Sequence, residues 1–114
     1  MFLKKIYDAF SNSFKGIYRA LRQEFAFKIE FTLSAFLIPL AFFIGENALE
    51  VILLCGSTLL ILLVELLNTA IETTLNRVGL EENDLTRYAK DLGSGAVLIS
   101  LILWLVTWSL AVVY

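Results

Sequence analysis

Four polar residues recur along an apolar stretch of the sequence, at a spacing that could bind a cation or move a proton. They are Glu65, Asn68, Glu72 and Asn76, and the segment that carries them reads VELLNTAIETTLN from Val64. At 100° per residue of an α-helix, the four side chains fall within an arc of about 80°. Carboxylate and amide oxygens are hard ligands of the kind that Mg²⁺ prefers. The spacing therefore indicates a divalent cation site or a proton site on one helix face.

This polar stripe, the set Glu65, Asn68, Glu72 and Asn76, follows a run of apolar residues. A charged side chain at the centre of a membrane helix costs about 2.5 to 3.5 kcal/mol to insert, so such acids usually face protein, water or a bound ion. The alternative is that the stripe only forms hydrogen bonds between helices. Asn68 alone could have that role, but two acids on one face favour a functional site.

Composition narrows the class of protein. The chain has 114 residues, of which 59% are hydrophobic, so we expect one domain embedded in a membrane. There is no histidine, which excludes histidine bases and histidine metal ligands. Cys55 is the single cysteine, which excludes an intrachain disulfide and favours a packing role. No glycine-rich phosphate loop occurs, and no nucleic acid partner is expected.

The hydrophobic pattern predicts an all-α integral membrane protein with three transmembrane helices and an N-terminal amphipathic surface helix. Near the N-terminus, apolar residues recur at steps of three and four with Lys and Arg between them, which is typical of a helix lying on an anionic membrane surface. Gly79 is a plausible helix stop, and Asn83 or Asp84 a plausible N-cap. The predicted segments are a surface helix over 1–27, spans over 29–44, 48–75 and 92–114, and a connection over 77–90.

The positive charges predict the orientation in the membrane. Of the nine Lys and Arg residues, six precede the first span and three lie in the connection over 77–90. The positive-inside rule therefore places the N-terminus and this connection in the cytoplasm, and the C-terminus outside. Glu65 lies 17 residues after Ala48, about 25 Å along a helix, which is most of the way across the bilayer core. The polar stripe should lie near the cytoplasmic interface, where nucleotides and free Mg²⁺ are available.

The last span begins with a row of mostly small residues, Ala89, Gly93, Ala96, Val97 and Ser100. Rows of this kind let helix backbones approach closely, so we interpret this one as a packing surface. Three spans make a small core for a membrane protein. We therefore expect self-association that buries the polar stripe.

Three motifs carry a resemblance to a known family. VELLNTAIE, the later AKDLGSGAV and the earlier FKGIYRALRQE are similar to signatures of the prokaryotic diacylglycerol kinase family, and the similarity extends over nearly the whole chain. The resemblance implies a homotrimeric enzyme of the bacterial inner membrane. It would transfer phosphate from ATP to diacylglycerol in a Mg²⁺-dependent reaction, with three spans and an amphipathic surface helix.

The resemblance also implies roles for particular residues. Glu65 corresponds to the general base of the family, next to the lipid hydroxyl. Glu72 and Glu24 correspond to the metal-binding acids. The residues that correspond to the nucleotide site are Asn68, Glu72, Lys90, Asp91 and Glu24, and those near the lipid acceptor are Glu65, Glu30 and Ser94.

Two alternative functions stay open at this point. Ile29 is apolar where members specific for diacylglycerol tend to have Gln, a feature shared with undecaprenol kinases, whereas Val64 and the residues LGS at 92–94 favour the diacylglycerol branch. Asn76 stands where many members have Asp, and no contact is transferred to it. A small proton-coupled exporter also uses an intramembrane Glu, but such exporters generally need four spans.

Overall fold

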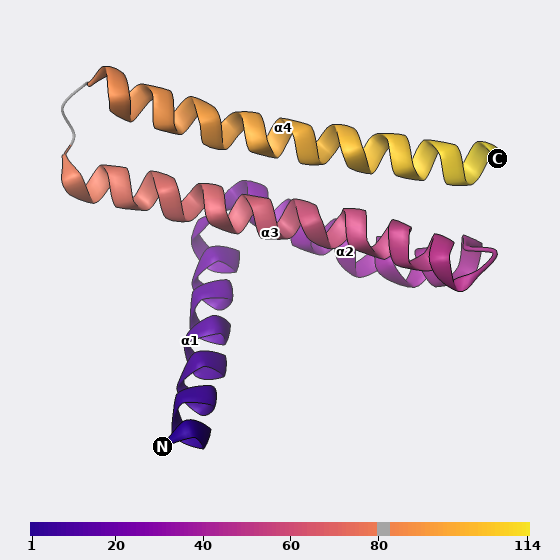
Figure 1. The fold of residues 1–114 in the computed structure, drawn as a ribbon, viewed down its shortest axis with the longest axis horizontal. Helices are drawn as coiled ribbons and strands as arrows, with labels where there is room; N and C mark the ends of the chain where they lie inside the picture. Colours follow the sequence, from indigo (N-terminus) through magenta and orange to yellow (C-terminus); the bar gives the residue numbers. More distant parts are fainter. Residues whose placement is uncertain (80–82) are drawn as a thin grey trace.

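The computed structural model describes residues 1–79 and 83–114, and in these ranges the secondary structure is helical throughout. The helices are α1 (Phe2–Gln23), α2 (Phe25–Ile44), α3 (Ala48–Val78) and α4 (Asp84–Val113). Figure 1 shows α2, α3 and α4 running alongside one another, while α1 projects across their direction. Three of them, α2, α3 and α4, are long and apolar enough to cross a membrane. The all-α fold with three spans and a separate N-terminal helix is confirmed.

The chain turns between α1 and α2 at one residue, Glu24. Its backbone is extended, with φ −103° and ψ 109°, and its N–H still donates to the carbonyl of Ala20 at 2.8 Å. The hydrophobic pattern predicts this change later, with the surface helix reaching residue 27 and the span starting at 29. Instead, residues 25–28 belong to α2 and lengthen it to 20 residues. A helix of that length is about 30 Å long, which matches the bilayer core.

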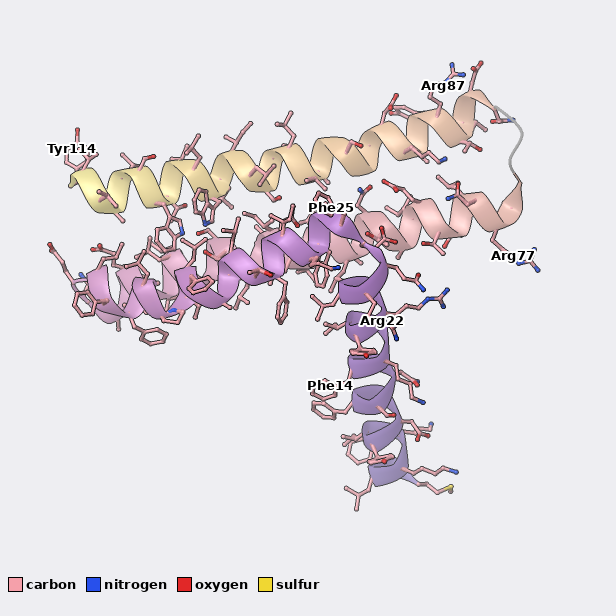
Figure 2. All side chains as sticks on the ribbon, turned by 180° about the vertical axis from the view of Figure 1, so that it is seen from behind. Phe14, Arg22, Phe25, Arg77, Arg87 and Tyr114 are labelled. Atoms are coloured by element: carbon pink, nitrogen blue, oxygen red, sulfur yellow. The ribbon has the colours of Figure 1, made fainter. Side chains whose placement is uncertain are left out.

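The first helix is amphipathic, as predicted. Figure 2 shows Phe14 projecting to one side of α1, away from the other helices, and this side chain is 69% exposed. An apolar side chain that finds no protein partner on a membrane protein suits burial among lipid headgroups and acyl chains. The crosswise direction of α1 is the direction that such a surface helix needs.

Both long helices extend beyond their predicted spans. α3 ends at Val78, and Gly79 forms its C-cap, as predicted. α4 already begins at Asp84, because Asn83 accepts a hydrogen bond from the N–H of Leu85 at 2.8 Å and caps the helix. Residues 84–90 of the predicted connection are therefore helical, and residues 80–82 lie outside the described ranges. Helices of 31 and 30 residues are longer than the bilayer core, so their polar ends can extend into water.

About two helical turns before Glu65, a tryptophan pair fastens α4 to α3. Trp108 donates to the carbonyl of Leu54 at 3.2 Å, and Trp104 donates to the hydroxyl of Thr58 at 3.1 Å. The two indole rings stack at 5.6 Å. Because lipid offers no partners for N–H groups, these hydrogen bonds fix the position of α4 along α3. Cys55 packs against the same cluster, in agreement with its predicted packing role.

Candidate functional site

Glu65 of the polar stripe lies within electrostatic reach of three other carboxylates, which come from three parts of the fold. The charges of Glu72 and Glu24 act on Glu65, and the charge of Glu65 acts on Glu30. Glu24 lies at the junction of α1 and α2, Glu30 lies on α2, and the other two lie on α3. The turn at Glu24 matters here, because it carries one acid of the cluster out of the surface helix and toward α3. We call these four residues the acidic cluster.

Three of the four residues of the polar stripe are turned toward the interior of the bundle. Asn68 is only 8% exposed, and its Nδ2 donates to Glu72 Oε1 at 3.0 Å. By contrast, Leu67 and Ile71, on other faces of the same helix, are 58% and 40% exposed. Glu65 and Glu72 are half-buried. Asn68 is thus turned away from the lipid-facing side of α3, and the two acids partly so, whereas Asn76 is exposed.

Asn68 also marks a place where α3 and α4 approach each other closely. Gly93 of α4 is buried, and a Cβ built on it would overlap the Oδ1 of Asn68. This contact confirms the predicted packing role of the small-residue row at Gly93. The Oδ1 atom itself is buried and has no hydrogen-bond partner within residues 1–79 and 83–114.

Lys90 reaches back to α3 through the last residue of the polar stripe. Its Nζ donates to Asn76 Oδ1 at 3.2 Å, and in the part of the chain that the structure describes it has no carboxylate partner. Its positive charge therefore stays available to an anion beside the acidic cluster. Asp91 and Ser94, the other two predicted residues of α4, are exposed. Their side chains form no hydrogen bond or ion pair within the described ranges.

Two hollows lie beside the acidic cluster. A groove of about 200 Å³ runs between the end of α1 and α3, and its lining includes Arg19, Glu24, Thr69 and Thr73. The sequence analysis missed the two threonines and Arg19. The signal was present, because Thr69 and Thr73 fall next to Glu65 on the helical wheel and widen the polar stripe on that side.

The second hollow is a cavity of about 130 Å³ between α2, α3 and α4. Its lining is mostly apolar and includes Leu33, Leu37 and Ile61, with Glu30 among the few polar residues. The Oε2 atom of Glu30 is buried and has no hydrogen-bond partner within the described ranges. Glu65 is electrostatically coupled to an acid at each hollow, Glu24 at the first and Glu30 at the second.

The carboxylates fit a magnesium ion that is shared with a phosphate ligand. Within residues 1–79 and 83–114 no three acidic or cysteine side chains are close enough to hold a metal ion by themselves. Mg²⁺ is usually held by one or two carboxylates and completes its octahedron with water and substrate phosphates. Glu24 and Glu72 can supply that number of ligands, and Lys90 adds a charge of the sign that phosphates require.

Comparison with known proteins connects this arrangement to one family. A sequence profile described as prokaryotic diacylglycerol kinase matches residues 11–112. The chain belongs to this family. A protein named diacylglycerol kinase from Haemophilus influenzae is 44% identical over 96 residues, covering 84% of this chain and 81% of the relative. Proteins of the same name from Pseudomonas aeruginosa and Escherichia coli are 43% and 38% identical, covering 94% and 91% of this chain and 87% and 85% of the relatives.

The family assignment confirms the resemblance seen in the motifs. The matched range includes the whole polar stripe, the AKDLGSGAV segment and Glu24. It also disfavours the exporter hypothesis, because the proteins that the chain resembles are named as kinases. The roles of individual residues are not tested by the comparison, and we treat them below as proposals.

Proposed function

We propose that this protein is a lipid kinase that transfers the γ-phosphoryl group of ATP to diacylglycerol and forms phosphatidic acid at the cytoplasmic face of the membrane. The observation that carries this proposal is the acidic cluster around Glu65, in a chain of the prokaryotic diacylglycerol kinase family. Curated relatives named diacylglycerol kinase favour diacylglycerol over undecaprenol as the acceptor.

Glu65 acts as the general base in this proposal. Its carboxylate accepts the proton of the primary hydroxyl of diacylglycerol as the hydroxyl oxygen forms a bond to the γ-phosphorus. The bond between this phosphorus and the bridging oxygen breaks, and ADP leaves with that oxygen. The electrostatic link of Glu65 to both Glu24 and Glu30 supports this role, since a base must lie between the nucleotide and the acceptor.

The nucleotide side of the site lies toward Glu24, Glu72 and Lys90. Glu24 and Glu72 would hold Mg²⁺, which when bound offsets negative charge on the phosphates. Lys90 contributes a positive charge that no carboxylate of the described ranges neutralises. Asp91 and Asn68 complete the predicted nucleotide site, Asn68 by holding Glu72. Because phosphoryl transfer needs little covalent help from the protein, catalysis is chiefly positioning.

The acceptor side lies toward Glu30 and Ser94. The mostly apolar cavity at Glu30 supports this assignment, because an acceptor lipid must bring acyl chains as well as a hydroxyl. Ser94 is exposed on α4, where a lipid or a second subunit can contact it.

The membrane arrangement brings the two substrates together. α1 lies in the headgroup layer with its basic face toward anionic lipid, the N-terminus is cytoplasmic and the C-terminus is outside, in the bacterial inner membrane. Figure 2 supports this orientation, since Arg77 and Arg87 lie at one end of the bundle and Tyr114 at the other. ATP reaches the acidic cluster from water, and diacylglycerol reaches it from the bilayer.

A homotrimer is part of the proposal. Glu65 and Glu72 are only half-buried in one chain, and most large apolar side chains of the three spans are exposed. Packing of subunits would cover part of this surface and shield the polar stripe from lipid.

One experiment tests the reaction and its acceptor together. The purified protein in detergent receives γ-labelled ATP, Mg²⁺ and either diacylglycerol or undecaprenol, and labelled lipid is measured. We expect transfer to diacylglycerol and much slower transfer to undecaprenol. Faster transfer to undecaprenol would indicate that the apolar residue at position 29 marks an undecaprenol kinase. Transfer to neither lipid would refute the proposed function.

A further inference from the structure

Gly93 occupies the point where α4 meets the polar stripe. A Cβ built on it would overlap the Oδ1 of Asn68 and lie 3.2 Å from its Cγ. Two residues further along the same helix, a Cβ built on Gly95 would have no atom within 4 Å. The missing side chain at position 93 therefore makes room for one particular group, the amide of Asn68.

Asn68 fills this space in one orientation. Its Nδ2 donates to Glu72 Oε1 at 3.0 Å, while its Oδ1 is buried against Gly93 without a hydrogen-bond partner in the described ranges. A reversed amide would direct its oxygen at the carboxylate, and the hydrogen bond would be lost. A buried acceptor without a partner costs about 1 to 3 kcal/mol. The unpartnered oxygen therefore lowers the stability of the fold at the same residue whose amide nitrogen orients Glu72.

The contact matters because of what it does to Glu72. This carboxylate lies one helical turn after Asn68, and the amide restrains its Oε1 atom. The Oε2 atom is left for a ligand. Carboxylates that bind metals are themselves hydrogen-bonded by neighbouring groups, which fix their orientation. In this site, the orientation of a proposed magnesium ligand on α3 depends on a residue of α4 that has no side chain.

We propose that Gly93 is a positioning residue for the magnesium–nucleotide site. By letting Asn68 pack against the backbone of α4, it holds Glu72 with one carboxylate oxygen hydrogen-bonded and the other free for the cation. This inference rests on the proposed function. In it, Asn68 affects nucleotide binding indirectly, by orienting Glu72. Gly93 itself touches neither the metal nor the nucleotide.

A purely structural role for Gly93 leads to a different expectation. If Gly93 only lets two helices pack, an added methyl group lowers stability, and the folded fraction still binds metal and nucleotide normally. If Gly93 positions Glu72, the folded protein binds the cation more weakly, and this loss requires Asn68. Cation affinity and stability therefore have to be measured separately.

The test compares Gly93→Ala with its matched control Gly95→Ala. Binding of Mn²⁺, a spectroscopic substitute for Mg²⁺, is measured by electron paramagnetic resonance in the presence of a non-hydrolysable ATP analogue. We expect Gly93→Ala to weaken Mn²⁺ binding about tenfold or more, as is typical when a group supporting a metal ligand is disturbed. Gly95→Ala should bind as the unaltered protein does. Unchanged Mn²⁺ affinity in folded Gly93→Ala would overturn the inference.

A second pair of variants covers the case in which Gly93→Ala does not fold. In Asn68→Ala the group that the new methyl would strike is absent, so Gly93→Ala can be added to it without overlap. We expect Asn68→Ala to weaken Mn²⁺ binding, and the double variant to match Asn68→Ala. A further loss of affinity in the double variant, or its failure to fold where Asn68→Ala folds, would show that Gly93 acts independently of Asn68 and would overturn the inference.

The same measurements separate this inference from the proposed function. If the unaltered protein neither binds the Mn²⁺–nucleotide complex nor transfers phosphate to lipid, the proposed function fails. If it does both and Gly93→Ala behaves like Gly95→Ala, the proposed function stands and only the role of Gly93 fails. KM for diacylglycerol should stay unchanged in Gly93→Ala, because Glu72 lies on the nucleotide side.

Discussion

The interface between α3 and α4 is built differently in its two halves. In the half with the tryptophan pair, the N–H groups of Trp104 and Trp108 both find acceptors on α3. In the half with the acidic cluster, Asn68 Oδ1 is buried without a partner in the described ranges, and Glu30 Oε2 is in the same state on the neighbouring α2. We call these the tryptophan half and the charged half. The first has its hydrogen bonds satisfied internally, and the second does not.

The two halves of the interface therefore have different roles, one in positioning the helices and the other in binding ligands. A satisfied polar network in lipid fixes two helices in one register, because breaking it leaves groups without partners. Buried polar atoms without partners are rare in folded proteins and are often kept for a ligand. The tryptophan half can therefore hold α4 in place while the charged half keeps oxygen atoms available for a cation and a hydroxyl.

The largest expected effect is that of Glu65→Gln in the charged half. The substitution keeps the size of the side chain and removes its ability to accept the proton, so we expect kcat to fall by about 10² to 10⁴-fold. Folding and MgATP binding should be retained, as measured by thermal stability in detergent and by nucleotide affinity. Glu46→Gln, in the exposed turn between α2 and α3, is the control and should keep full activity. Near-normal turnover in Glu65→Gln would remove the general-base assignment.

Glu72→Gln should act on binding more than on turnover. Glutamine can still accept the hydrogen bond from Asn68 Nδ2, so the local structure survives and only the negative charge is lost. We expect the Mg²⁺ concentration for half-maximal activity to rise about tenfold or more. Direct Mn²⁺ binding checks this, and an unchanged requirement for the cation would exclude Glu72 as a ligand.

Asn76→Leu probes the amide that holds Lys90. Leucine has a similar size but accepts no hydrogen bond, so the Lys90 ammonium loses its tether to α3. The loss of about 0.5 to 1.5 kcal/mol for such a bond corresponds to roughly a two- to tenfold rise in KM for ATP. Asn76→Asp retains an acceptor oxygen and should restore most of the loss. In a Lys90→Met background, Asn76→Leu should have no further effect on KM.

Trp108→Phe tests the tryptophan half and should have the smallest effect on chemistry. It removes the N–H that donates to the carbonyl of Leu54 and keeps an aromatic ring. Interhelical hydrogen bonds in membranes average about 0.6 kcal/mol, so we expect a stability loss of about that size in detergent unfolding. kcat and KM should not change in the folded enzyme. A large loss of activity without a loss of stability would show that the tryptophan half contributes to catalysis and not only to stability.

Much of the charged half could be predicted from sequence, because its signals are local. The helical spacing of Glu65, Asn68 and Glu72 already places them on one face, and the apolar residues around them already require that face to turn inward. Cap residues such as Asn83 and Gly79 were likewise readable from the chain. The boundary at Glu24 was not, because helical pattern continues on both sides of it.

Contacts between helices were beyond the reach of the sequence. The small-residue row on α4 predicted close packing, but five positions were candidates and only the fold pairs Gly93 with Asn68. The hydrogen bonds of the tryptophan pair could not be predicted from the sequence, in which the pair is only part of an uncharged span. Their partners Leu54 and Thr58 lie about 50 residues earlier in the chain. Arg19 was missed for the same reason, since it shares a groove with Thr69 and Thr73 only after α1 turns at Glu24.

The amino-acid sequence by itself determined that this protein has three segments long and apolar enough to cross a membrane, with acids on one face of the second, since periodicity and hydropathy are properties of each segment alone. The tertiary structure decided which segments meet those acids. It places Glu24 and Glu30 near Glu65 and sets an amide against a glycine of another helix. Such pairings depend on how side chains of separate helices fit together in space, and no single segment carries that information.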